Sequence, residues 1–206
     1  MGKYGKIFKD QITTDNPVLV QIIGICSALA VTNLAMNSLI MGIALAFVTG
    51  LSSLTISLLK DIMPNHLRMV VQVFIISFYV IIVDIFLRAY MPEMSRTLGP
   101  YVGLIITNCI IMGRAEAYAM SNPPIASFID GVAAGIGYTL VLLAVAIPRE
   151  ILRFGSIFGL HIMPEGFTPW TLMVMPPGAF FILPIIMWIA YNLIHKNDVE
   201  EKKEAK

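Results

Sequence analysis

Charged residues are scarce in this 206-residue chain. They make up 13% of the sequence, whereas about a quarter of a typical soluble domain is charged. Hydrophobic residues make up 57%, and the charges gather at the two ends and in short stretches between long apolar runs. This composition excludes an ordinary soluble domain and predicts an all-α integral membrane protein in contact with lipid. No basic patch with interleaved aromatics occurs, so no nucleic-acid partner is expected.

Signatures of nucleotide-binding and hydrolytic sites are also missing. No GxGxxG, Walker, nucleophile-elbow or HExxH pattern occurs. No polar stretch is long enough to form a soluble domain that could bind a nucleotide. We therefore expect that this chain does not bind NADH, that it has no catalytic residue of its own, and that any enzymatic activity belongs to a larger assembly.

Six apolar runs are long enough to cross a membrane, which takes about 20 residues. The runs cover residues 17–36, 39–59, 70–90, 101–120, 125–147 and 171–194. The longest connection, residues 148–169, contains Arg149 and Glu150 and is expected to lie outside the hydrocarbon. Lysine and arginine are more frequent on the side of the two termini, which predicts that both termini are cytoplasmic.

Cysteine is nearly absent, and its two occurrences are informative. Cys26 and Cys109 lie in similar segments, residues 24–30 and 107–113, that are 83 positions apart. This offset divides the six runs into three plus three. Because three is odd, the second half must insert upside down relative to the first, which predicts an inverted-topology repeat.

The repeat defines the expected organisation of the chain. Residues 1–16 are a cytoplasmic N-terminal segment, 17–97 the first three-helix repeat, 98–195 the second, inverted repeat and 196–206 a charged cytoplasmic tail. Glycine and polar residues interrupt the first run of each half. Such residues are tolerated at membrane depth where a helix breaks and faces protein. We therefore predict that the first helix of each half is broken near the midplane, with its cysteine at the break.

Cys26 and Cys109 are the candidate metal ligands. Iron suits a pair of thiolates better than zinc if electrons are moved, because zinc has no redox chemistry. A [2Fe–2S] cluster needs four ligands, so a partner chain or a second copy would have to supply the others. A mononuclear iron is an alternative centre, and a pair of inert buried thiols is the competing interpretation.

Charged residues within the apolar runs are candidates for electrostatic tuning or an ion path; they are Arg114, Glu116, Asp84 and Asp130. An arginine at the bilayer centre costs at least about 2.5 kcal/mol on insertion scales. Arg114 and Glu116 either tune a nearby anionic cluster or form structural ion pairs. Asp84 can pair with Arg88 one turn later. Asp130 either lines a cation path or caps a helix.

The residues around both cysteines resemble a known family. They read DNP at 15–17, GICSALAVT at 24–32, ITNCIIMGRAEA at 106–117 and DG at 130–131. These motifs resemble the family shared by the D and E subunits of the Na⁺-translocating NADH:quinone oxidoreductase and the A and E subunits of the Rnf complex. The similarity covers nearly the whole chain and is greatest to the D-type members. The Rnf E subunit is the close alternative, although it tends to have Cys-Pro where this chain has Cys26-Ser27.

The resemblance implies a six-span inverted repeat in the bacterial inner membrane and a role as an electron relay in an NADH:quinone oxidoreductase that translocates Na⁺. It implies that Cys26 and Cys109 provide two of the four ligands of a 2Fe–2S cluster shared with a homologous E-type subunit of opposite orientation. Electrons would come from a cytoplasmic, NADH-oxidising subunit with FAD and 2Fe–2S. They would pass to a covalently bound FMN on the opposite side of the membrane and finally to ubiquinone. The FMN would belong to flavin-bearing membrane subunits.

Three alternatives to this function stay open. One is the E subunit of the Rnf ferredoxin:NAD⁺ oxidoreductase, in the same family. The second is a small inverted-repeat transporter, because broken helices in inverted repeats are typical of transporters. The third is a metal-free scaffold that anchors catalytic subunits.

Overall fold

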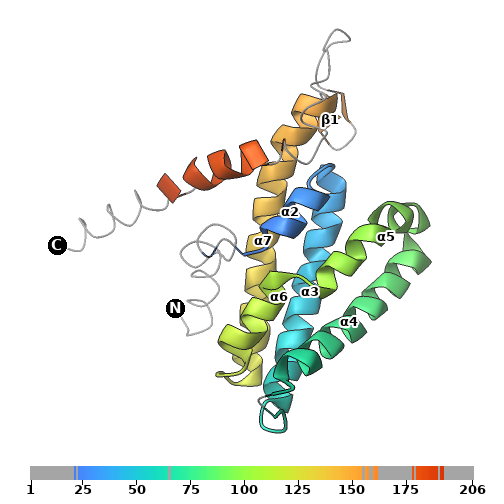
Figure 1. The fold of residues 1–206 in the computed structure, drawn as a ribbon. Coiled ribbons are helices and arrows are strands. Elements are labelled where there is room, and N and C mark those ends of the chain that lie inside the picture. Colours follow the sequence, from blue (N-terminus) through green and yellow to red (C-terminus); the bar gives the residue numbers. More distant parts are fainter. Residues whose placement is uncertain are drawn as a thin grey trace, which may run out of the picture.

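The computed structural model describes residues 21, 23–64, 66–154, 156–157, 160–161, 178, 180–189 and 191–192. The elements in this part of the chain (Figure 1) are the helices α2 (Ile25–Val31), α3 (Ala35–Leu59), α4 (Arg68–Tyr90), α5 (Pro92–Ile106), α6 (Cys109–Arg114) and α7 (Pro124–Phe154), the π-helix η1 (Ala115–Ala119), and the strands β1 (Ser156–Ile157) and β2 (Leu160–His161). The two strands pair as an antiparallel hairpin. A further apolar helix covers Phe180–Ile189. The predicted segments 1–16 and 196–206 lie outside the described residues.

Three of the described helices are long and apolar enough to cross a membrane. They cover Ala35–Leu59, Arg68–Tyr90 and Pro124–Leu152, with mean hydropathies of 2.1, 2.6 and 2.0. They correspond to the predicted runs 39–59, 70–90 and 125–147, and they confirm the helical membrane class. The outer face of α4 is apolar, with Phe74 76% exposed and Phe78 58% exposed, which suits contact with lipid tails rather than water.

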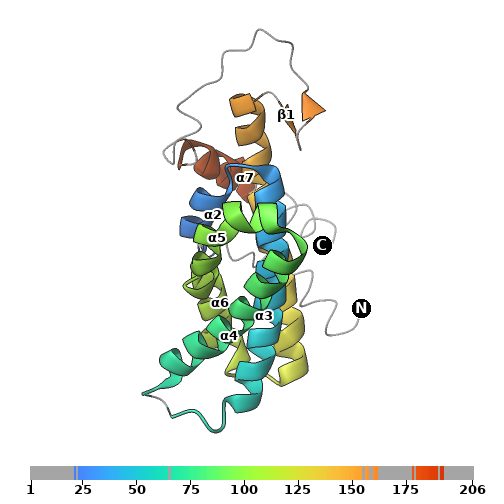
Figure 2. The ribbon, with the colours of Figure 1, turned by 90° about the vertical axis from the view of Figure 1, so that its right-hand side faces the viewer.

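Helices α3 and α7 lie side by side along the length of the molecule (Figures 1 and 2). Small residues line their contact: Gly135 of α7 lies against Ala46 of α3, and Gly131 lies against Thr49. A Cβ atom at Gly131 would come within 2.8 Å of the Thr49 carbonyl oxygen. In lipid, helices are held by close packing and hydrogen bonds rather than by a hydrophobic force between them. These glycines therefore allow the contact on which the fold depends.

Each cysteine lies in the first turn of a short helix, Cys26 in α2 and Cys109 in α6. Helix α2 follows Gly24 and ends at Val31, after which α3 starts at Ala35. Helix α5 ends at Ile106, and α6 starts at Cys109 after the N-cap residue Asn108. The first turns of α2 and α6 lie next to each other at mid-height, and the two helices run toward opposite ends of the molecule (Figures 1 and 2).

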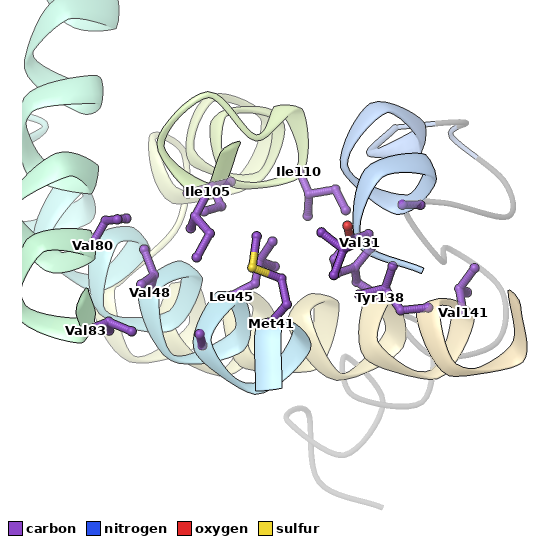
Figure 3. Close-up of a cluster of buried hydrophobic side chains, with 14 of the residues drawn as sticks. Val31, Met41, Leu45, Val48, Val80, Val83, Ile105, Ile110, Tyr138 and Val141 are labelled. Atoms are coloured by element: carbon purple, nitrogen blue, oxygen red, sulfur yellow. The ribbon is translucent and has the colours of Figure 1, made fainter. Parts of the chain in front are cut away.

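A buried hydrophobic core joins the short helices to the long ones. Side chains from α2, α3, α4, α5, α6 and α7 meet in it, as Figure 3 shows. Leu45 of α3, Ile110 of α6 and Tyr138 of α7 are at most 1% exposed. The core therefore fixes the start of α6, and with it Cys109, against α3 and α7.

Helix α7 is longer than the sequence predicted. It continues through Pro148 to Phe154, although a loop outside the hydrocarbon was expected from residue 148 onward. The prediction of a connection is wrong for Arg149 and Glu150, which lie in the helix and are 1% and 4% exposed. Their charges tolerate burial because they bind polar groups of the turn between α2 and α3, which no local sequence pattern indicates.

Candidate metal centre

The structure brings the two cysteines close together. Both are free thiols, with Cys26 exposed and Cys109 partly exposed. Cys109 Sγ lies 3.0 Å from the backbone nitrogen of Gly24, two residues before Cys26, so the fold places the two cysteines near each other. The Gly24 N–H donates a hydrogen bond to this sulfur. One thiol from each predicted half thus lies near the other, and one sulfur already accepts a backbone hydrogen bond.

Gly24 makes this hydrogen bond because of its backbone conformation. Its φ angle is 91°, in the left-handed region that residues with a Cβ rarely adopt. A Cβ at this position would also lie 2.5 Å from Ile110 Cδ1. A glycine is therefore required where α2 begins beside α6.

A buried polar cluster lies behind the thiols. Ser27 Oγ donates to the Gly24 carbonyl oxygen at 3.0 Å and lies 2.6 Å from the Tyr138 hydroxyl. Asn108 Nδ2 donates to Ser27 Oγ at 3.1 Å. The Asn108 side chain also caps α6, because its Oδ1 accepts from the Ile110 N–H at 3.0 Å. The cluster therefore ties the starts of α2 and α6 to α7.

The sequence identifies only part of this cluster. Ser27 and Asn108 were recognisable as polar interruptions beside the two cysteines. Tyr138 was not, because a tyrosine in an apolar run has no pattern that indicates its partner. It is 0% exposed, and a buried tyrosine hydroxyl usually needs a hydrogen-bond partner.

Arg114 and Asp130, two of the predicted charged candidates, form one buried ion pair. Arg114 Nε and Nη2 donate to the two carboxylate oxygens of Asp130, at 2.9 Å and 2.5 Å. Arg114 is 7% exposed and Asp130 1% exposed. The guanidinium also lies 5.5 Å from the centre of the Tyr118 ring. Such a two-bond pair fixes the relative position of α6 and α7.

The other two candidates pair elsewhere. Glu116 accepts hydrogen bonds from Arg68 Nη1 and Gln72 Nε2, each at 2.9 Å. Asp84 pairs with Arg88 at 2.8 Å, one turn apart on α4, as the sequence spacing allows. All four candidates thus have partners of opposite or complementary polarity, which favours structural roles for these charges.

Arg149 and Glu150 hold the turn between α2 and α3. Arg149 Nη1 donates to Thr32 Oγ1 at 2.6 Å, and its Nη2 donates to Asn33 Oδ1 at 3.1 Å. Glu150 Oε2 accepts from the Ala35 N–H at 2.9 Å. A carboxylate at the N-terminus of a helix satisfies a free N–H group and interacts favourably with the helix dipole. The end of α7 thereby fixes where α3 begins.

In the part of the chain that the structure describes, the two cysteines are not joined by further metal ligands. Among these residues no group of three or more His, Cys, Asp or Glu side chains could hold a metal ion. Two neighbouring thiols fit two positions of a four-thiolate iron–sulfur centre.

Fold and site together define a helical integral membrane protein with a pair of thiols between two short helices. The chain belongs to the Rnf-Nqr family of membrane subunits. The family model, described as "Rnf-Nqr subunit, membrane protein", matches residues 4–187. The family resemblance of the cysteine motifs is thereby confirmed.

Curated relatives match nearly the whole chain, and those named here are D subunits of the Na⁺-translocating NADH-quinone reductase. The relative from Chlamydia felis is 46% identical over 203 residues, which cover 94% of this chain and 95% of the relative. The relative from Shewanella sp. (strain W3-18-1) is 47% identical over 189 residues, covering 89% of this chain and 90% of the relative. The relative from Chlamydia pneumoniae is 43% identical over 210 residues, with 97% of each chain covered.

Proposed function

We propose that this chain is the D-type membrane subunit of a bacterial Na⁺-translocating NADH:quinone oxidoreductase, an enzyme of several subunits. Within it, the chain relays electrons through a [2Fe–2S] cluster held by Cys26, Cys109 and two thiolates of a homologous E-type subunit. The observation that carries the proposal is the 3.0 Å hydrogen bond from the Gly24 N–H, two residues before Cys26, to Cys109 Sγ, which brings together two cysteines that lie 83 positions apart in the sequence. The relatives named above are D subunits of this enzyme, which favours it over the Rnf counterpart.

The two thiols fit such a centre. When bound, an iron–sulfur cluster supplies one-electron redox chemistry, and hydrogen bonds to its sulfur ligands tune its potential. In this chain the Gly24 N–H already donates to Cys109 Sγ. The Tyr138 side of the site is closed by buried groups, whereas Cys26 is exposed. The exposed side of the site, at Cys26, is where a partner subunit would supply the other two thiolate ligands.

The proposed topology is a 3+3 inverted repeat of six spans, with residues 17–97 and 98–195 as its halves. Adding the 83-residue offset to α2 gives residues 108–114, which match α6 within one residue. The two short helices run toward opposite ends of the molecule (Figure 1). Helices α3 and α7, which follow them, also run in opposite directions and pack together. In this topology both termini are cytoplasmic, and each short helix belongs to a broken first span.

The proposed route of electrons follows from the position of the thiols. The short helices that carry them, α2 and α6, lie at mid-height between the ends of the long helices (Figure 1). A centre held there would divide electron transfer across the membrane into two shorter steps. The donor is the cytoplasmic FAD/2Fe–2S subunit, and the acceptor is a covalent FMN on a flavin-bearing membrane subunit. Arg114 lies on the same short helix as Cys109 and is paired with Asp130 of α7, so it would hold α6 in place beside the centre.

The test is the content of iron and acid-labile sulfide per intact complex, with EPR spectroscopy after reduction, in wild type and in Cys26→Ala and Cys109→Ala variants. We expect each variant to lose one cluster's worth of iron and its EPR signal while the other subunits still assemble. Ser53, which is remote in sequence from both cysteines, offers a control. The Ser53→Ala variant should keep the iron content and the EPR signal of wild type. Unchanged iron and signal in the cysteine variants would show that the thiols are packing residues, as the scaffold and transporter alternatives require.

A further inference from the structure

We propose that Tyr138 is a positioning residue for the paired thiols. Acting through Ser27, its hydroxyl holds Gly24 in the conformation that donates to Cys109 Sγ, and it thereby sets the reduction potential of the centre. This inference rests on the proposed function, because it concerns a cluster bound at Cys26 and Cys109.

The hydrogen-bond capacity of Ser27 favours one direction for each bond. A serine hydroxyl has one hydrogen to donate and two lone pairs to accept. Its hydrogen goes to the Gly24 carbonyl oxygen, and one lone pair accepts from Asn108 Nδ2. The remaining lone pair faces the Tyr138 hydroxyl, 2.6 Å away. In the arrangement that we propose, Tyr138 donates to Ser27, whose hydrogen and two lone pairs are then all used.

Tyr138 is well placed to hold both cysteine-bearing helices. Ser27 lies in the first turn of α2, and Asn108 is the N-cap of α6. Tyr138 contacts Ser27 directly and is linked to Asn108 through the Ser27 hydroxyl. Its hydroxyl is on α7, one of the long apolar helices, so it anchors two short helices to a rigid one. Its ring would lie 3.4 Å from a Cβ at Gly24, so it also packs against the glycine itself.

Tyr138 and Ser27 affect Cys109 Sγ through the backbone of Gly24. The hydrogen bond from Ser27 to the Gly24 carbonyl oxygen stabilises the left-handed backbone of this residue, whose N–H points at Cys109 Sγ. An N–H donor stabilises a sulfur ligand more when the cluster carries the extra negative charge of the reduced form. Loosening this donor should therefore lower the potential. Outer partners of this kind orient ligands without binding the metal.

The experiment compares Tyr138→Phe with wild type in the intact complex, by redox titration monitored by EPR together with iron and sulfide analysis. We expect full iron content and a midpoint potential that shifts to more negative values. Tyr79→Phe is the matched control, because it removes a tyrosine hydroxyl bonded to Thr55 Oγ1 at 2.7 Å in the contact between α3 and α4. Its potential should equal that of wild type.

A second variant separates positioning through Ser27 from a general loss of packing. Ser27→Ala should shift the potential in the same direction. The double variant Ser27→Ala/Tyr138→Phe should shift it no further than Ser27→Ala alone, because residues that act through one link are not additive. If Tyr138→Phe loses its iron, the single variant Ser27→Ala decides: a negative shift supports the proposal, and an unchanged potential overturns it.

The two proposals fail in different ways. An unchanged potential in an iron-replete Tyr138→Phe complex overturns the role of Tyr138, while a cluster that depends on Cys26 and Cys109 still stands. Additive shifts in the double variant overturn the link through Ser27. A wild-type complex whose iron does not depend on the two cysteines overturns the proposed function, and the role of Tyr138 with it.

Discussion

At the scale of single residues, Gly24 has the strictest requirement in the site. Replacing it with alanine forces a Cβ into a left-handed conformation and against Ile110 Cδ1, 2.5 Å away. Strained backbone of this kind costs on the order of 1–3 kcal/mol. We therefore expect Gly24→Ala to lower the thermal stability of the complex and to reduce its iron content.

Gly113→Ala is the matched control for this substitution. It lies in α6 near the same site, and the nearest atom to its added Cβ is Ile23 Cδ1 at 3.7 Å, an ordinary van der Waals distance. Within a helix, alanine is more favourable than glycine by about 1 kcal/mol. If both variants melt at the same temperature as wild type in a thermal unfolding assay, Gly24 is not required for the fold of the site.

The residues of the site were predictable to different degrees. That Cys26 and Cys109 lie near each other could be expected from their equivalent positions in the inverted repeat that we propose, because such a repeat brings equivalent points together. Asp84 could be assigned to Arg88 from helical spacing. The pair between Arg114 and Asp130 could not, because it joins two helices, and sequence spacing says nothing about contacts between elements.

At the scale of elements, the start of α3 depends on a residue from another helix. The N-cap Leu34 has no side chain that can accept a hydrogen bond, and Glu150 of α7 accepts from the Ala35 N–H instead. Loss of a cap costs about 0.5–2 kcal/mol. Glu150→Ala should therefore increase hydrogen exchange in the first turn of α3, measured by mass spectrometry on peptides that cover residues 33–40.

Glu150→Gln tests whether the acceptor or the charge is needed. Glutamine keeps an oxygen that can accept from Ala35, so exchange should rise less than in Glu150→Ala. The last turns of α3, near Leu59, serve as an internal reference and should exchange as in wild type. Equal exchange of the first turn in wild type and Glu150→Ala would show that α3 does not need this cap.

The long helices were predictable from apolar length alone, and the end of α7 was not. Runs of about 20 apolar residues identify α3, α4 and most of α7, because backbone groups in lipid must be satisfied within a helix. The same criterion stops α7 at Pro148, where Arg149 and Glu150 follow. These charges are compatible with a buried helix only because Thr32, Asn33 and Ala35 are there to bind them.

At the scale of the whole molecule, the chain leaves one side of its thiol site open. Cys26 is exposed, although α2, the helix that contains it, lies at mid-height of the long helices (Figure 1). Lipid is a poor environment for a thiolate, because a charge in hydrocarbon is costly without a partner. The exposed thiol is therefore expected to be covered in the complex by the metal centre and by the partner that completes it.

This arrangement predicts how the thiols react before and after removal of the metal. In the intact complex, N-ethylmaleimide should label neither Cys26 nor Cys109. After removal of the iron by an oxidant and a chelator, followed by reduction of the freed cysteines back to thiols and removal of the reductant, both should be labelled, and Cys26 faster because it is more exposed in this chain. Mass spectrometry of the two cysteine peptides gives the extent of labelling at each site. Equal labelling of Cys26 before and after iron removal would mean that no metal protects it, and the open side of the site would then need another explanation.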